Sequence, residues 1–152
     1  MLVDAYQRPI KDLRISVTDR CNFRCSYCMP LDHYEWIDKK EILTFEEITR
    51  FAKLAIELGV EKIRLTGGEP LVRQDLPLLI EKLAAREGLH DICLTTNGAL
   101  LGERVQALKQ AGLRRVNISI DTLDAEKFKQ MTKRGDLDKV LEGIFAAKSA
   151  GL

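Results

Sequence analysis

Three cysteines lie within eight residues of one another in the segment CNFRCSYC, residues 21–28. Cys21, Cys25 and Cys28 offer three soft thiolate ligands, which favour zinc, copper(I) or an iron–sulfur cluster. Structural zinc normally takes four ligands, and a cubane cluster has four metal corners that usually bind one cysteine each. Three thiols on one loop therefore suit three irons of a 4Fe–4S cluster, with the fourth iron left open to a chelating ligand.

Two other interpretations of this segment stay open at this stage. A zinc ion could use the three thiols with His33 as a fourth ligand, and Cys25 with Cys28 forms a C-x-x-C pair of the thioredoxin type. The redox pair would leave Cys21 without a role. The remaining cysteine, Cys93, lies inside a predicted strand, where we expect an inert packing thiol.

The composition excludes some classes of function. The 152 residues carry 24 Lys and Arg against 23 Asp and Glu, a net charge of +1, whereas nucleic-acid binders usually show a basic excess. No apolar run reaches the length of a membrane span, and the first residues lack the apolar core of a secretory leader. We therefore expect a cytoplasmic protein with no nucleic-acid or membrane partner, whose cysteines bind metal or take part in catalysis rather than form disulfides.

The secondary-structure pattern alternates between β-rich segments and amphipathic helices. The predicted strands cover residues 13–18, 61–66, 91–96 and 114–119. Predicted helices begin at the Thr44–Glu47 capping box, at Asp75 and at Leu101, and end at Gly59, Gly88 and Gly112; a fourth helical region, 124–150, is broken near Gly135. This order predicts an α/β fold of right-handed βα units with a parallel sheet.

The predicted strands alternate polar and apolar residues instead of being apolar throughout. The polar set that shares one face comprises Arg14, Ser16, Thr18, Lys62, Arg64, Thr66, Asn117, Ser119 and Asp121. A closed eight-stranded barrel fills its interior with bulky apolar side chains, so this pattern favours an open parallel (βα)n barrel around a hydrophilic cavity. The alternative is a sheet with one solvated face.

The extent of this barrel is also predicted. The sequence AGL at 111–113, before the fourth strand, recurs at 150–152, where a fifth strand is due. We therefore expect about four βα units, a half barrel, so that residues 1–152 are the N-terminal part of a partial barrel domain whose C-terminal half is absent.

The cysteine loop follows the first predicted strand, and a polar or glycine-rich segment follows each of the other three predicted strands in the same way. These segments are TGGEP (66–70), LTTNG (94–98) and NISIDT (117–122). Adjacent glycines let the backbone approach a ligand closely. Ordinary turn chemistry is the alternative for each segment taken alone.

The cysteine loop, with aromatic Tyr27 before its last cysteine, and the TGGEP segment together resemble the radical S-adenosylmethionine superfamily. This resemblance implies that Cys21, Cys25 and Cys28 bind a 4Fe–4S cluster, with S-adenosylmethionine at the open iron. It also implies that Gly68 contacts the amino group of that cofactor with Gly67 and Glu69 in support. Tyr27 and Ser119 are further implied cofactor contacts.

Within this superfamily, RISVTDRCNFRCSYCMP and IRLTGGEPLVR resemble the molybdenum cofactor biosynthesis protein A family, the GTP 3′,8-cyclases, from about residue 5 to the end. The resemblance implies a radical lyase that converts GTP to (8S)-3′,8-cyclo-7,8-dihydroguanosine 5′-triphosphate, the first step of molybdenum cofactor biosynthesis. Residues matching Arg14, Arg64 and Thr95 contact GTP in that family, and no catalytic acid or base is identifiable in this half.

The same resemblance implies a reducing electron donor, allows a homodimer of the full-length protein, and places a second 4Fe–4S cluster in the missing C-terminal half. We therefore expect that this chain alone does not complete turnover. Another radical enzyme acting on a peptide or a different small molecule stays open, as does a non-enzymatic zinc-binding module. Arg14 and Arg64 have an alternative role in internal ion pairs with Asp121 or Glu69.

Overall fold

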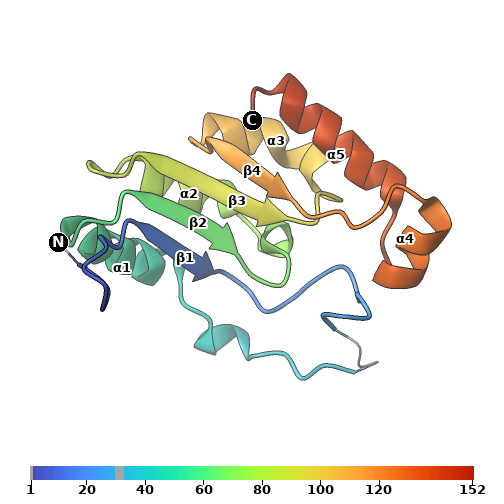
Figure 1. Ribbon diagram of the computed structural model, residues 1–152, viewed down its shortest axis with the longest axis horizontal. Coiled ribbons are helices and arrows are strands. Elements are labelled where there is room, and N and C mark those ends of the chain that lie inside the picture. The colour runs from blue at the N-terminus through green and yellow to red at the C-terminus, as the bar shows by residue number, and fades with distance from the viewer. Residues whose placement is uncertain (1, 30–32) are drawn as a thin grey trace.

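The computed structural model describes residues 2–29 and 33–152, and its centre is a parallel four-stranded sheet (Figure 1). The strands are β1 (Asp12–Ser16), β2 (Lys62–Thr66), β3 (Asp91–Thr96) and β4 (Arg115–Ile118). Their order in the sheet, β1-β2-β3-β4, equals their order in the chain. All four predicted strands are confirmed.

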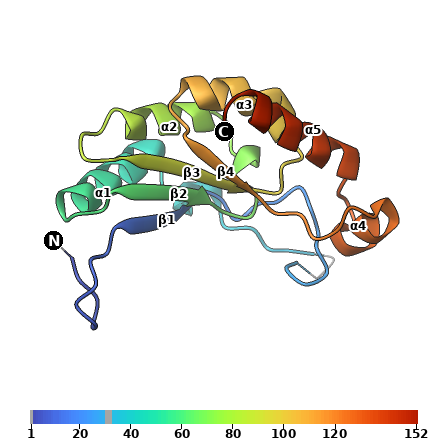
Figure 2. The same cartoon turned by 45° about the horizontal axis from the view of Figure 1, so that its top comes forward.

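Helices cover one face of this sheet, and the other face is open (Figure 2). The covering helices are α1 (Phe45–Glu57), α2 (Leu76–Ala84), α3 (Leu101–Gln110) and α5 (Leu137–Ser149). Helix α4 (Ala125–Thr132) lies beyond the carboxyl ends of the strands (Figure 1), and the short 3-10 helices are η1 (Lys39–Glu41) and η2 (Pro70–Val72). Right-handed crossovers between strands taken in chain order put every crossover helix on the same face. This one-sided winding is that of a barrel segment, as predicted.

The predicted capping box of α1 and the predicted break between α4 and α5 are both confirmed. The Glu47 N–H donates to Thr44 Oγ1 at 3.2 Å, and the Thr44 N–H donates to Glu47 Oε2 at 2.7 Å. At the break, Gly135 packs so closely that a Cβ would lie 2.4 Å from Thr132 Oγ1. Only glycine fits there without a rearrangement.

The second helix begins directly after Asp75, as predicted, but the expected capping bond and the expected end at Gly88 are wrong. Asp75 occupies the N-cap position of α2, but its backbone is left-handed, with φ of 56°, and its side chain makes no capping hydrogen bond. The helix ends at Ala84 instead of continuing to Gly88. The chain turns back towards β3 over residues 86–89, where the Leu89 N–H donates to the Arg86 carbonyl, so this turn replaces the last helical residues.

The main core lies between the sheet and its helices. Ile63, Leu65 and Leu94 point from the strands into it and are almost fully buried, against Leu79 of α2 and Leu108 of α3. The opposite face carries exposed Arg14 and Asn117 and half-buried Arg64. The predicted alternation of polar and apolar faces is therefore confirmed.

A second, smaller apolar cluster lies at the carboxyl end of the sheet. It contains Phe23, Phe128, Leu137 and Val140, and the Phe23 and Phe128 rings meet edge to face with centroids 5.9 Å apart. Since Phe23 comes from the cysteine loop, this cluster joins that loop to α4 and α5.

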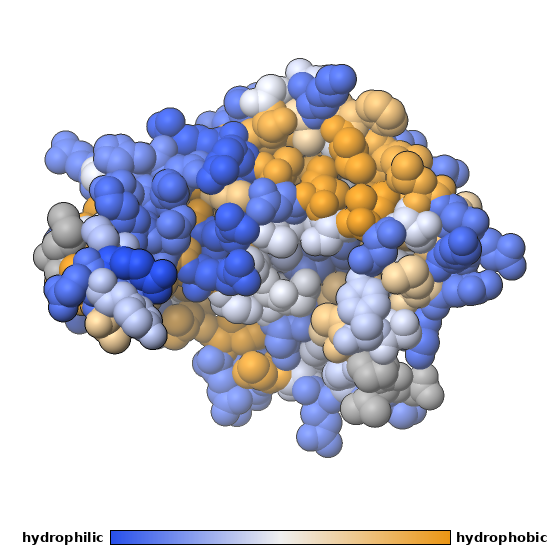
Figure 3. Space-filling model, in the orientation of Figure 1, coloured by the Kyte–Doolittle hydropathy of each residue, from blue (hydrophilic) through white to orange (hydrophobic). Residues whose placement is uncertain are grey.

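The β4 side of the molecule carries an apolar surface. β4 pairs with β3 along one edge, and half-buried Val116, Ile118, Leu141 and Ile144 of β4 and α5 lie beside exposed Phe145. Figure 3 shows apolar side chains gathered in this region. Among the described helices, none combines the length and the apolar character needed to cross a bilayer.

Candidate cofactor site

A cleft of about 230 Å³ opens at the carboxyl ends of the strands. Seven of the predicted site residues line it, namely Cys21, Cys25, Cys28, Tyr27, Gly68, Thr95 and Ser119. Polar loops that follow parallel strands meet at one edge of a sheet, where enzymes of this architecture place their chemistry. The structure thus brings together the predicted metal ligands, the predicted cofactor contacts and one predicted substrate contact.

The cysteine loop is held against the end of α4 (Figure 1). The Arg24 N–H donates to the Thr132 carbonyl at 3.0 Å, and the Ser26 N–H donates to the Met131 carbonyl at 2.9 Å. The last carbonyls of a helix have no partner within it, so the loop satisfies two acceptors that α4 leaves free. Together with the buried Phe23 ring, these bonds fix the position of the three thiols.

The three thiols are free, with Cys21 and Cys25 half-buried and Cys28 exposed. Burial raises the pKa of the Cys21 and Cys25 thiols. Within residues 2–29 and 33–152, no three His, Cys, Asp or Glu side chains converge on a point where one metal ion would sit, and His33 is exposed. Three thiols on one loop can each bind a different iron of a cubane cluster. The donor set fits a 4Fe–4S cluster.

Cys93 differs from these cysteines, as predicted. It lies in β3, is 3% exposed, and its Sγ is within 3.7 Å of Asn117 Oδ1. It does not line the cleft.

The TGGEP turn packs directly on the residues that lead into Cys21. A Cβ on Gly68 would lie 2.4 Å from the Arg20 carbonyl oxygen, and one on Gly67 would lie 2.5 Å from the Thr18 carbonyl oxygen. The Gly68 N–H donates to that Thr18 oxygen at 2.8 Å. The glycines are therefore required by close contact between two backbone segments, which seats the turn beside the cysteine loop.

Glu69 joins the ends of β2 and β3 through a buried carboxylate. It is 1% exposed and accepts hydrogen bonds from the Thr96 hydroxyl at 2.7 Å, the Asn97 N–H at 2.7 Å and the Leu71 N–H at 3.0 Å. Burial raises the pKa of this carboxyl group, and the three donors oppose that shift. Its role in this structure is to hold the floor of the cleft together.

Asn97 is a site residue that the sequence did not single out. Its Nδ2 donates to Asn22 Oδ1 at 2.8 Å and lies 4.0 Å from Cys21 Sγ, so it connects the end of β3 to the cysteine loop. The signal available was its place in LTTNG, directly after a predicted strand.

Tyr27 connects the cysteine loop to the segment after β4. Its hydroxyl donates to Asp121 Oδ2 at 2.6 Å, and this bond raises the pKa of the phenol.

The Thr95 hydroxyl is unpaired, because its Oγ1 is buried and has no hydrogen-bond partner among the described residues. Buried polar atoms in native proteins are nearly always paired, so an orphan hydroxyl on the cleft wall fits a ligand contact.

Arg14 and Arg64 lie beside each other on the open face, because they are register partners in β1 and β2. Neither side chain forms an ion pair or a hydrogen bond within the described residues. The two carboxylates of the alternative interpretation are engaged elsewhere, Asp121 with Tyr27 and Glu69 with Thr96. Two neighbouring cations repel each other and attract an anion.

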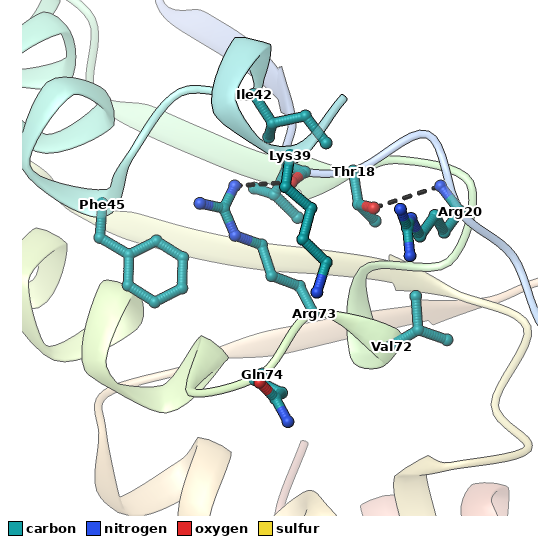
Figure 4. Close-up of a pocket in the computed structure, with 9 residues that line it drawn as sticks. Thr18, Arg20, Lys39, Ile42, Phe45, Val72, Arg73 and Gln74 are labelled. Atoms are coloured by element: carbon teal, nitrogen blue, oxygen red, sulfur yellow. Dashed lines mark hydrogen bonds between the residues drawn. The ribbon is translucent and has the colours of Figure 1, made fainter. Parts of the chain in front are cut away.

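A larger cavity of about 530 Å³ lies beside η1 and the start of α1 (Figure 4). Arg73 lines it, donating to the Val17 carbonyl at 2.6 Å and the Leu43 carbonyl at 2.7 Å, with its guanidinium 4.4 Å from the centre of the Phe45 ring. Burial lowers the pKa of Arg73. This arginine connects loops, and no thiol reaches the cavity, so the cluster chemistry belongs to the smaller cleft.

Residues 15–152 match the Radical SAM superfamily, and the chain belongs to that superfamily. A 4Fe–4S cluster and S-adenosylmethionine are therefore its cofactors, as predicted. Superfamily membership also favours the interpretation that the open polar face lines the interior of a barrel, over the alternative that it is only a solvated face of a sheet.

Two curated relatives are similar along the whole chain. A GTP 3′,8-cyclase of Peptoclostridium acidaminophilum is 54% identical over 152 residues, which are 100% of this chain and 47% of the relative. A GTP 3′,8-cyclase of Pseudomonas fluorescens (strain Pf0-1) is 51% identical over 99% of this chain and 45% of the relative. The chain thus spans about half the length of the curated relatives it matches.

Solved structures share the fold at low sequence identity. HydG, a maturase of the [FeFe]-hydrogenase, has a TM-score of 0.76 at 21% identity over 93% of this chain and 33% of its own. Methylornithine synthase has a TM-score of 0.73 at 21% identity over 95% of this chain and 43% of its own. The α/β barrel-segment fold is confirmed.

Proposed function

We propose that the chain is the N-terminal part of a GTP 3′,8-cyclase, a radical lyase that forms (8S)-3′,8-cyclo-7,8-dihydroguanosine 5′-triphosphate from GTP in molybdenum cofactor biosynthesis. The observation that carries the proposal is that a three-thiol cleft and two arginines without an ion pair among residues 2–29 and 33–152 lie on the same open side of one sheet. Relatives that bear this name at 51–54% identity support it.

Each group of residues has a proposed role. Cys21, Cys25 and Cys28 ligate three irons, and when bound, the cluster supplies the electron that cleaves S-adenosylmethionine and starts radical chemistry. Tyr27, Gly68 and Ser119 orient S-adenosylmethionine in the cleft, where each lines the wall.

The proposed substrate contacts lie deeper on the open face and beside the cleft. Arg14 and Arg64 bind the anionic GTP, because a guanidinium that has no carboxylate partner among the described residues gains most from a charge-assisted hydrogen bond to phosphate. Thr95 offers its orphan hydroxyl to the nucleotide. The chain presents no acid or base for which a proton-transfer role is proposed.

We further propose that residues 1–152 are the N-terminal part of a partial barrel domain. The apolar surface beside β4 suits a following βα unit, and the open polar face needs an opposite wall to keep water from a radical (Figure 3). A second cluster, a reducing electron donor and a homodimer belong to the same proposal, as does a cytoplasmic setting, which suits free thiols.

The test is an anaerobic assay of the full-length protein with GTP, S-adenosylmethionine and a reductant, following both 5′-deoxyadenosine and the cyclised nucleotide. The proposal predicts both products from the full-length protein. It predicts no cyclised nucleotide from residues 1–152 alone, although uncoupled cleavage of S-adenosylmethionine survives. If GTP did not accelerate the cleavage of S-adenosylmethionine by the full-length protein, and no cyclised nucleotide formed, the result would point instead to a radical enzyme for another substrate.

A further inference from the structure

Arg24 lies between two of the cysteines and turns its side chain back onto the loop that carries it. Its Nη1 donates to the Cys21 carbonyl at 2.7 Å and to the Phe23 carbonyl at 2.6 Å. One guanidinium nitrogen therefore holds two carbonyls of the same short turn together. Hydrogen bonds from a charged donor are about twice as strong as neutral ones, so these two contacts favour one loop shape over the alternatives.

The same guanidinium is covered by aromatic rings from the segment that follows the loop. It lies 5.1 Å from the centre of the Trp36 ring and 5.8 Å from that of Tyr34, and the two rings stack with centroids 5.6 Å apart. Next to this stack, the Ile37 N–H donates to Asp19 Oδ2 at 2.7 Å. The segment 34–37 thus contacts Asp19, which precedes the cysteine loop, and Arg24, which lies within it.

The charge of Arg24 has no carboxylate partner among the described residues. It is half-buried, and its contacts are carbonyl oxygens and ring faces, which are attracted to a cation without neutralising it. A positive charge without a carboxylate partner among the described residues is thereby fixed within the cysteine loop, whose three thiols become thiolates when they bind metal. The potential of an iron–sulfur cluster depends on nearby charge and hydrogen bonding.

We propose that Arg24 is a positioning residue for the iron–sulfur cluster, which shapes the cysteine turn through the Cys21 and Phe23 carbonyls and raises the reduction potential through its charge. The inference rests on the proposed ligand role of the three cysteines. It adds a function for a side chain that is neither a ligand nor a contact of the cleft.

The test compares three variants of the full-length protein after anaerobic reconstitution with iron and sulfide. Arg24→Gln removes the charge, Arg24→Lys keeps the charge but loses the planar stack, and Arg20→Gln is the matched control. Arg20 directly precedes Cys21, and its exposed side chain lines the separate cavity of Figure 4. The readouts are the rate of iron loss to a chelator and the reduction potential from a titration followed by electron paramagnetic resonance.

Arg24→Gln should lose iron on the order of tenfold faster than the unchanged protein and shift the potential to a more negative value, since two charge-assisted hydrogen bonds and one charge are lost. Arg24→Lys should lose iron faster but keep a potential close to the original. Arg20→Gln should change neither. Circular dichroism establishes that each variant is folded, and Trp36→Leu, which removes one stacking ring, should also speed iron loss without a change of charge.

Iron loss and potential in Arg24→Gln that equal those of Arg20→Gln would overturn the inference while leaving the ligand assignment intact. A protein that takes up no cluster, or keeps it after substitution of Cys21, Cys25 and Cys28, would instead show that the underlying proposal fails.

Discussion

The two faces of the sheet carry different kinds of side chain on the same strands. In β2, Leu65 is fully buried against the helices, whereas its neighbour Arg64 points to the open face and has no ion pair or hydrogen bond with the described residues. Burial of apolar area stabilises the fold, whereas exposed or half-buried charged side chains on the other face contribute little to it. Stability and chemistry are thus separated across the thickness of one sheet, so substitutions on the two faces should have separable effects.

The largest stability effect should come from the covered face. Leu65→Ala removes a fully buried side chain and should lower the free energy of unfolding by about 2–5 kcal/mol. Arg64→Ala, one residue away on the open face, should change it by less than about 0.5 kcal/mol. Urea denaturation of the full-length protein measures both, and equal losses would contradict the separation of the two faces.

Gly68, in the turn after β2, sharpens the comparison because its substitution should affect both the stability of the fold and the binding of the cofactor. Gly68→Ala places a Cβ against the Arg20 and Asp19 carbonyl oxygens, so the turn and the cysteine loop must move apart, at a cost of about 1–3 kcal/mol. S-adenosylmethionine binding, measured by calorimetry, should be lost. Gly102→Ala is the matched control, since its Cβ would have no neighbour closer than 3.9 Å and it lies in α3. Unchanged cofactor binding in Gly68→Ala would remove the cleft assignment.

The effects of substitutions on the open face should appear only with substrate present. Arg14→Ala or Arg64→Ala should weaken GTP binding by about 1.5–3 kcal/mol, roughly ten-fold or more in the dissociation constant, because a charge-assisted contact is lost. S-adenosylmethionine binding should be unchanged. Equilibrium dialysis measures the GTP affinity. If both variants bound GTP as tightly as the original protein, Arg14 and Arg64 would not be GTP contacts.

The fold could be predicted because its signals are local. Alternating strands, the Thr44–Glu47 capping box and the break near Gly135 each depend on residues a few positions apart. Asp75 marks the start of α2 as predicted, but it does not cap the helix as an aspartate in this place usually does, because its backbone is left-handed and its side chain makes no capping bond.

The supports of the candidate site were harder to predict, because they are contacts between distant segments. The cysteine loop bonds to the Met131 and Thr132 carbonyls, and any residue type offers such acceptors, so no sequence pattern marks them. Asn97 reaches the loop across 75 residues of sequence. The sequence indicated which residues carry the chemistry, and the structure adds what holds them in place.

The most direct test of the three-thiol cleft is anaerobic reconstitution of the full-length protein after substitution of each cysteine in turn. Iron, sulfide and zinc are measured, and electron paramagnetic resonance spectra are taken with and without S-adenosylmethionine. Cys21→Ala, Cys25→Ala and Cys28→Ala should each lose one cluster, about four irons and four sulfides per chain, while Cys93→Ala, buried in β3, should keep it. S-adenosylmethionine should change the spectrum of the reduced cluster that these cysteines bind. Zinc without sulfide, or a cluster that depends on Cys93 but not on Cys25, would contradict the assignment.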